Sequence, residues 1–108
     1  MNRGEIWVST DSGYATKPRP VVIIQSDRYQ QNESVVTCLI TSHPVDFTGD
    51  VYRMELPKTP NNGLAVDSFI MIDKIVAIPR KRLNTYVGTI DPALMHELQQ
   101  RLFDFISE

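Results

Sequence analysis

Arg19 stands between two prolines at the start of the apolar run Val21–Ile24. A residue that precedes proline is pushed out of the helical region, and proline donates no ladder hydrogen bond, so this segment is expected to begin a strand. The arginine is therefore held in an extended segment at the edge of a core. A guanidinium in such a place is suited to bind an anion. An ordinary ion pair or a solvated edge cation is the alternative interpretation.

Two hydroxyl side chains, Thr41 and Ser42, follow the next apolar run, Ser34–Ile40. If the two runs pair as antiparallel strands, the start of one lies beside the end of the other. Arg19 and both hydroxyls would then meet at one edge of the sheet. A guanidinium beside hydroxyl groups fits the phosphate of RNA, because it offers two-point charged bonds next to neutral donors. A simple turn cap is the alternative for the hydroxyl pair.

Other kinds of chemistry find little support in the sequence. His43 and His96 lie far apart without cysteine or carboxylate partners at ligand spacing, so no metal site is predicted. No glycine-rich phosphate loop or dinucleotide fingerprint is present, so no cofactor is expected. Cys38 lies within an apolar run and is expected to be a buried, unreactive thiol. The cluster 80–82 of three basic residues is either a solvated turn or a contact for a polyanion.

Length and composition favour one compact domain over residues 1–108. The chain is 42% hydrophobic and 22% charged, which is typical of a globular protein. Its net charge of −2 provides no overall positive field, so a polyanion would need a local patch. No stretch has the character of a signal peptide or a membrane span, so we expect a cytoplasmic protein that makes no contact with a membrane.

Several stretches are expected to be strands, because they are rich in β-branched residues or alternate between apolar and polar ones. They are Glu5–Ser9, Val21–Gln25, Ser34–Ile40, Val51–Leu56, Ala65–Ile72, Ile75–Ile78 and Tyr86–Ile90. Asp73 and Lys74 are expected to interrupt a longer strand. Loops or helical turns are expected at 10–16, 26–30, 46–50, 57–63 and 79–83. The pair Asn62-Gly63 favours a turn with positive φ.

A helix is predicted after the last strand, with Asp91 as its N-cap and Pro92 as its first residue. Its apolar stripe comprises Leu94, Leu98, Leu102, Phe105 and Ile106, widened by Met95 and Phe103. Short strands followed by one amphipathic helix indicate a small, partly open β-barrel. The apolar breadth of this helix and of the strand 68–72 predicts a homodimer, because a chain this small covers little apolar surface alone.

The residues above carry a family pattern, and the sequence resembles the MazF/PemK/Kid family of toxin ribonucleases, the mRNA interferases of toxin–antitoxin modules. The resemblance covers nearly the whole chain in an ordered set of short motifs. They are Arg3-Gly4-Glu5-Ile6-Trp7-Val8, Arg19-Pro20-Val21-Val22-Ile23-Ile24, Cys38-Leu39-Ile40-Thr41-Ser42, Asn62-Gly63-Leu64, Asp73-Lys74-Ile75 and Arg82-Leu83. Each motif is weak alone, and their order and spacing make the set specific.

The resemblance implies a mainly β fold, the SH3-like CcdB/PemK-type barrel with a C-terminal helix, assembled as a homodimer. It implies a sequence-specific, metal-independent endoribonuclease that cleaves single-stranded mRNA by attack of a 2′-OH, and a cognate antitoxin protein with an acidic tail. The catalytic residues of the family map onto Arg19 and Thr41. An acidic residue of the family maps onto Asp73.

Further RNA contacts are expected from Lys17, Ser42, Asp73 and Lys74, and from Tyr14 by stacking on a base. A plain structural role is the alternative for Tyr14. The sequence departs from many relatives in the loop before Arg19, where Tyr14 and Ala15 replace a Glu-Gln pair. It also has methionine at position 71, where some relatives have a second arginine. The identity of the general base is therefore open.

Two other functions share this expected fold. One is a gyrase-inhibiting toxin of the CcdB type, although that group lacks the Arg-Pro and Thr-Ser motifs. The other is a non-catalytic SH3-like binding module. Cleavage of RNA by the purified protein separates the first interpretation from both.

Overall fold

The computed structural model describes residues 1–10, 18–43 and 52–108. The predicted turn at 46–50 and most of the predicted loop at 10–16 lie outside these residues. The elements are β1 (Glu5–Ser9), β2 (Arg19–Ile23), β3 (Ser34–Thr41), β4 (Arg53–Leu56), β5 (Ser68–Pro79), β6 (Leu83–Thr89) and α1 (Pro92–Ile106). Two single-turn 3₁₀ helices, η1 (Asp27–Tyr29) and η2 (Arg80–Arg82), complete the set.

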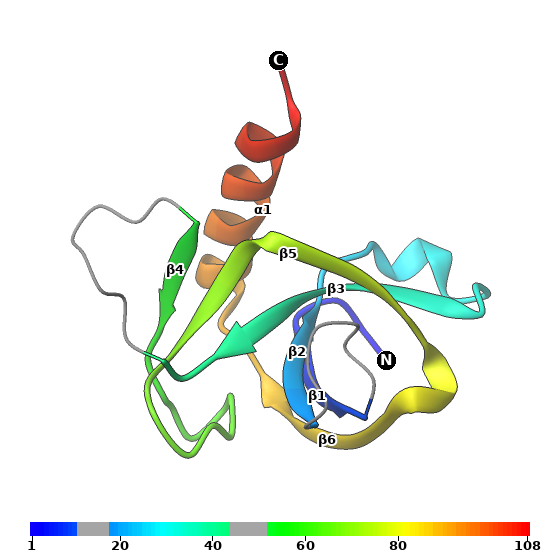
Figure 1. Ribbon diagram of the computed structural model, residues 1–108, viewed down its shortest axis with the longest axis horizontal. Helices are drawn as coiled ribbons and strands as arrows, with labels where there is room; N and C mark the ends of the chain where they lie inside the picture. Colours follow the sequence, from blue (N-terminus) through cyan, green and yellow to red (C-terminus); the bar gives the residue numbers. More distant parts are fainter. Residues whose placement is uncertain (11–17, 44–51) are drawn as a thin grey trace.

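The strands form one six-stranded antiparallel sheet in the order β4-β5-β3-β2-β1-β6. Figure 1 shows how strongly this sheet curls, with the long β5 arching over β3 toward the turn that leads into β6. The edge strands β4 and β6 do not pair with each other, so the barrel is not closed. The predicted class, a mainly β and partly open barrel with a C-terminal helix, is confirmed.

Strand β2 lies in the interior of the sheet, and its side chains enter two apolar clusters. On one face of the sheet, Val22 packs with Cys38 and Ile40 of β3 and with residues of α1. Val21 and Ile23 pack on the opposite face with Leu39. Successive side chains of a strand point to opposite faces, so a strand without polar residues must be covered on both. The prediction that this strand is buried on both faces is confirmed.

Helix α1 covers the first cluster. Asp91 caps it as predicted, because its Oδ1 accepts a hydrogen bond of 2.7 Å from the backbone N–H of Ala93. Met95 and Leu98 are buried, whereas the C-terminal end of the helix projects beyond the sheet in Figure 1. A helix able to span a bilayer is not found among the described residues, α1 being 15 residues long.

The predicted interruption at Asp73 and Lys74 is wrong, because β5 runs without a break from Ser68 to Pro79. The chain accommodates the two charged residues by a shift in pairing instead. Cys38 of β3 lies opposite Ile75, but Ile40 lies opposite Ile70, so β5 carries extra residues at this point. A bulge of this kind turns side chains away from the regular ladder, which lets charged residues remain half-exposed within a continuous strand.

Two other local predictions agree with the structure. Ser26 caps η1, with its Oγ accepting a bond of 3.2 Å from the N–H of Arg28. Gly63 has a φ of 68°, and a Cβ there would lie 2.1 Å from the carbonyl oxygen of Val87. The turn therefore needs glycine both for its conformation and for its close contact with β6.

We expect Val22→Asp to unfold the protein, because Val22 is completely buried and the new carboxylate would lack a partner. A loss of about 4 kcal/mol or more in the free energy of unfolding is expected, measured by urea denaturation. Val66→Asp is the matched control, since Val66 is half-exposed. Equal stability of the two variants would contradict the assigned core.

Cys38 gives a second test of the core. Burial, together with the nearby Asp73 carboxylate, raises the pKa of its thiol to about 12. Because the thiolate is the reactive species, native protein at pH 8 should react with iodoacetamide at least about a hundredfold more slowly than urea-unfolded protein. Raising the pH toward 12 should speed the native reaction. Equal rates for native and unfolded protein would show that the thiol is accessible.

Candidate functional site

The pairing of β2 with β3 brings Arg19 and Thr41 together. The two strands are antiparallel, with Val21 opposite Leu39. The same register continued to the strand ends sets Arg19, the first residue of β2, opposite Thr41, the last residue of β3. Both side chains lie on the face that carries Val21 and Leu39, because side chains alternate along a strand.

A cavity of about 240 Å³ lies at this end of the two strands. Four strands and the segment after β3 contribute to it, and its lining residues are Arg19, Leu39, Thr41, His43, Arg53, Met71 and Lys74. Leu39 and Met71 belong to the second apolar cluster, so the cavity opens directly above a packed core. A rigid floor of this kind holds the polar groups around it in fixed positions.

The charge of the cavity lining is positive. Arg19 comes from β2, Arg53 from β4 and Lys74 from β5. The Nζ of Lys74 lies 3.6 Å from Oδ2 of Asp73, and because both side chains are partly exposed this ion pair contributes little to stability. Three cations around one small cavity provide a local site for an anion such as a phosphodiester, despite the net negative charge of the chain.

Thr41 is 5% exposed, and its hydroxyl is held in a defined direction. Its Oγ1 accepts a hydrogen bond of 3.2 Å from the backbone N–H of His43. The carbonyl oxygen of His43 in turn accepts a bond of 3.1 Å from Nη1 of Arg53. Since a hydroxyl has one proton to donate besides its lone pairs, the proton of Thr41 is free to point toward a bound anion.

The residues predicted from the sequence fall into three groups. Arg19, Thr41 and Lys74 line the cavity, as described above. Ser42 is exposed and does not line it, and Asp73 contacts the cavity only through its ion pair with Lys74. Tyr14 and Lys17 lie outside the described residues.

Sequence reasoning missed Arg53 and His43. Arg53 reaches the cavity through the pairing of β4 with β5, where it lies opposite Met71. The sequence showed that Arg53 lies on the polar side of an alternating strand, but it did not show which strand pairs with this one. His43 was considered only as a metal ligand. Its position just after Thr41 was the signal that could have identified it.

Other candidates prove less suited to the chemistry. Among the described residues, no group of three or more His, Cys, Asp or Glu side chains gathers as a metal site would require. In the basic cluster 80–82, Arg80 has a structural role. Its Nε donates to the carbonyl oxygen of Asn32 at 2.5 Å and its Nη2 to that of Tyr29 at 3.3 Å.

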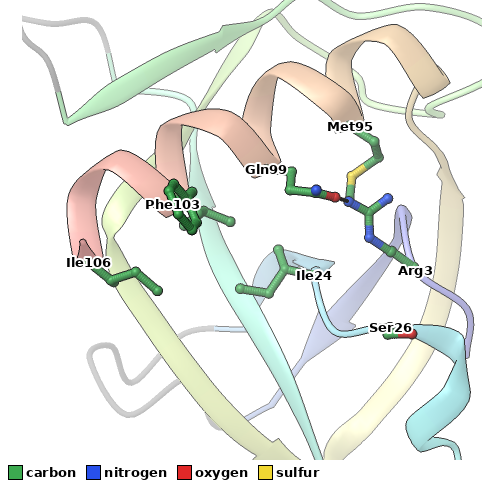
Figure 2. A pocket seen from close by; sticks show the side chains of 8 residues that line it. Arg3, Ile24, Ser26, Met95, Gln99, Phe103 and Ile106 are labelled. Carbon is green, nitrogen blue, oxygen red and sulfur yellow. Dashed lines mark hydrogen bonds between the residues drawn. The ribbon is translucent and has the colours of Figure 1, made fainter. Parts of the chain in front are cut away.

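A second cavity, of about 320 Å³, lies between α1 and the segment that follows β2. Figure 2 shows Phe103 and Ile106 on the helix facing Ile24 across it, with Arg3 hydrogen-bonded to Gln99 at one end. Its lining is mostly apolar, and its one cation already has a partner. This cavity therefore suits an apolar group better than a phosphate.

The chain is similar to known proteins over nearly its whole length. Residues 2–106 match the family described as PemK-like, MazF-like toxin of type II toxin-antitoxin system. A probable endoribonuclease MazF from Mycolicibacterium smegmatis is 36% identical over 107 residues, which cover 98% of this chain and 96% of that protein. Endoribonuclease MazF6 from Mycobacterium tuberculosis is 32% identical over 110 residues, covering 94% of this chain and 93% of that protein.

The fold is also found among solved structures. An endoribonuclease in complex with its cognate antitoxin, from a mycobacterial species, superposes with a TM-score of 0.77 over 96% of this chain and 92% of that chain. The sequences are 20% identical, so this likeness concerns the fold. The family match over residues 2–106 shows that the chain belongs to the PemK-like, MazF-like family of toxins of type II toxin–antitoxin systems.

Proposed function

We propose that this toxin is a sequence-specific endoribonuclease that cleaves single-stranded mRNA in the cytoplasm without a metal ion or cofactor. A single domain, residues 1–108, would carry the activity. The observation that carries the proposal is the cavity in which Arg19, Thr41 and Lys74 meet. A guanidinium, a hydroxyl and an ammonium around a cavity of about 240 Å³ supply the charge and the donors that cleavage of a phosphodiester requires.

In the proposed reaction, a ribose 2′-oxygen attacks the adjacent phosphorus and the bond from phosphorus to the 5′-oxygen breaks. The products are a 2′,3′-cyclic phosphate and a 5′-hydroxyl. Arg19 stabilises the negative charge that develops on the phosphorane, because a guanidinium remains protonated and binds two oxygens at once. Thr41 donates a hydrogen bond from its hydroxyl to a phosphate oxygen. Lys74 adds a second positive charge from β5.

The remaining predicted residues are proposed to hold the RNA chain on either side of the cleaved bond. Ser42 is exposed beside the cavity and is free to contact a neighbouring nucleotide. Asp73 would accept hydrogen bonds from a nucleobase of the RNA while its ion pair holds Lys74 in place. For Lys17 a phosphate contact is proposed, and for Tyr14 stacking on an unpaired base.

The proposed protein partner is a cognate antitoxin. An endoribonuclease with a similar fold forms a complex with its own antitoxin, which supports the same arrangement here. An acidic tail would find its cations at the cavity, at Arg19 and Lys74, rather than at Arg80, which is engaged with backbone carbonyls. The antitoxin and RNA would then compete for one surface.

A homodimer is also proposed, with an interface at a different place from the one expected from the sequence. The strand segment 68–72 was expected to leave apolar surface uncovered, but Ile70, Met71 and Ile72 are buried within one protomer. The two most exposed of the large apolar side chains among the described residues lie instead at the end of α1, where Phe103 is 63% and Ile106 is 69% exposed. A second copy is the proposed cover for this surface.

The test of the proposed function is incubation of the purified protein with single-stranded RNA in EDTA. We expect cleavage that leaves 2′,3′-cyclic phosphate ends, and no cleavage when the reactive ribose is 2′-deoxy or 2′-O-methyl. Arg19→Ala and Thr41→Ala should each lower the rate about 10²- to 10³-fold, because each removes a group that stabilises charge in the transition state. Arg19→Lys should also be slow, whereas Thr41→Ser should retain most activity.

Arg28→Ala and Thr85→Ala are the matched controls, since both residues are exposed and do not line the cavity. All variants should remain folded by circular dichroism. Unchanged rates for Arg19→Ala or Thr41→Ala would move the active site elsewhere. Failure of the wild-type protein to cut any RNA would favour the non-catalytic binding module.

For the dimer, we expect sedimentation of the wild-type protein at micromolar concentration to give twice the mass of one chain. The double change Phe103→Ser with Ile106→Ser should shift the protein toward monomer, because it removes exposed apolar surface without touching the core. Val66→Ser is the control for loss of an exposed apolar residue elsewhere. A wild-type protein that sediments only as a monomer would rule the dimer out.

A further inference from the structure

The proposed reaction needs a group that accepts the proton of the attacking 2′-OH, and the cavity contains one. We propose that the imidazole of His43 is this general base. The inference rests on the proposed function, since it assigns a further role within the same site. Histidine is the side chain that most often serves in such proton transfers, because its charge ordinarily changes between about pH 5 and 8.

The composition of the cavity lining supports the assignment. Arg19, Arg53 and Lys74 are cations, which have no lone pair available to take a proton at neutral pH. Thr41 has a weakly basic hydroxyl, and its oxygen already accepts the bond from His43. Leu39 and Met71 are apolar. Among the described residues that line the cavity, His43 therefore has the one imidazole, whose neutral form has a ring nitrogen with a lone pair that can accept a proton.

The backbone of His43 is fixed by two other residues of the cavity. Its N–H donates to Oγ1 of Thr41 at 3.2 Å, and its carbonyl oxygen accepts from Nη1 of Arg53 at 3.1 Å. The imidazole is thus attached to a segment tied to both β3 and β4, although the residue itself is exposed. A base held in this way beside the hydroxyl that binds the phosphate is well placed for the neighbouring 2′-OH.

The charged groups around His43 come from three strands. They are Arg19 of β2, Arg53 of β4, and Lys74 of β5 with its partner Asp73. A bound RNA phosphate would add an anion among them. Because any of these charges influences titration, the pH dependence has to be compared between variants of His43 that leave the other groups unchanged.

The proposed step exchanges one bond at phosphorus and moves two protons. The 2′-oxygen forms a bond to phosphorus while its proton passes to the neutral imidazole. The bond from phosphorus to the 5′-oxygen breaks, and the leaving oxygen takes a proton from water. The imidazolium then returns its proton to the hydroxide that remains, so the reaction produces no net change in protons and needs no oxidant or reductant.

The test is the single-turnover cleavage rate of a short RNA, measured from pH 5 to pH 9 for wild type and His43→Gln. Glutamine keeps the backbone bonds but does not accept a proton, so the rate should fall about 10²- to 10⁴-fold. The wild-type rate should rise with pH and then level off, because only neutral imidazole acts as a base. This rise should be absent in His43→Gln, while affinity for a 2′-O-methyl RNA stays unchanged.

His96→Gln is the matched control, since His96 is exposed on α1 away from the cavity, and it should behave as wild type. In His43→Ala, added imidazole should restore part of the rate and restore its rise with pH. A His43→Gln protein with wild-type rate and pH profile would overturn the assignment and leave the proposed function intact. A wild-type protein that cuts no RNA would overturn both.

Discussion

The antiparallel pairing of β2 with β3 is the constraint on which the rest of this structure depends. Val21, Val22 and Ile23 are buried on both faces of the sheet, and each fully buried side chain of this kind contributes about 1.5–3 kcal/mol. A slip of one residue would move every side chain of β2 to the opposite face, so Val22 would exchange places with Val21 and Ile23 between the two clusters. The packing of these side chains in the two clusters holds the register, and the register continued to the strand ends sets Arg19 opposite Thr41. The position of the proposed site follows from the packing of residues that take no part in the proposed reaction.

The location of the cavity at the strand ends reconciles two opposed requirements. A site for a phosphodiester needs several cations close together, but burying unpaired cations in a core is costly. Arg19, Arg53 and Lys74 meet the cavity from different strands and remain partly accessible to solvent, while Leu39 and Met71 close the floor beneath them. The apolar floor makes the site rigid, while two of the cations have partners beside the cavity, Arg53 at the carbonyl oxygen of His43 and Lys74 at the carboxylate of Asp73.

The sequence was sufficient for the features that depend on local pattern. The buried strand at Val21–Ile23, the cap at Asp91 and the turn at Gly63 each follow from residue type and spacing, and each is found. Features that depend on pairing between distant strands were not accessible in this way. The bulge at Asp73 and Lys74 is visible only in the shifted register of β3 against β5, and Arg53 reaches the site only because β4 pairs with β5. The roles of Arg19 and Thr41 came from the resemblance to a family and stay predictions.

The short path from Arg53 through His43 to Thr41 shows how a strand at the edge of the sheet can influence the site. β4 pairs only with β5, so its position is less constrained than that of β2 or β3. The bond from Arg53 to the carbonyl oxygen of His43 nevertheless ties it to the segment that orients the Thr41 hydroxyl. The orientation of that hydroxyl therefore depends on two hydrogen bonds worth about 1 kcal/mol each as well as on the packing of β3, in which Thr41 is buried. Because Arg53 belongs to the edge strand, a substitution in β4 can change the lining of this cavity while β2 and β3 keep the fold unchanged.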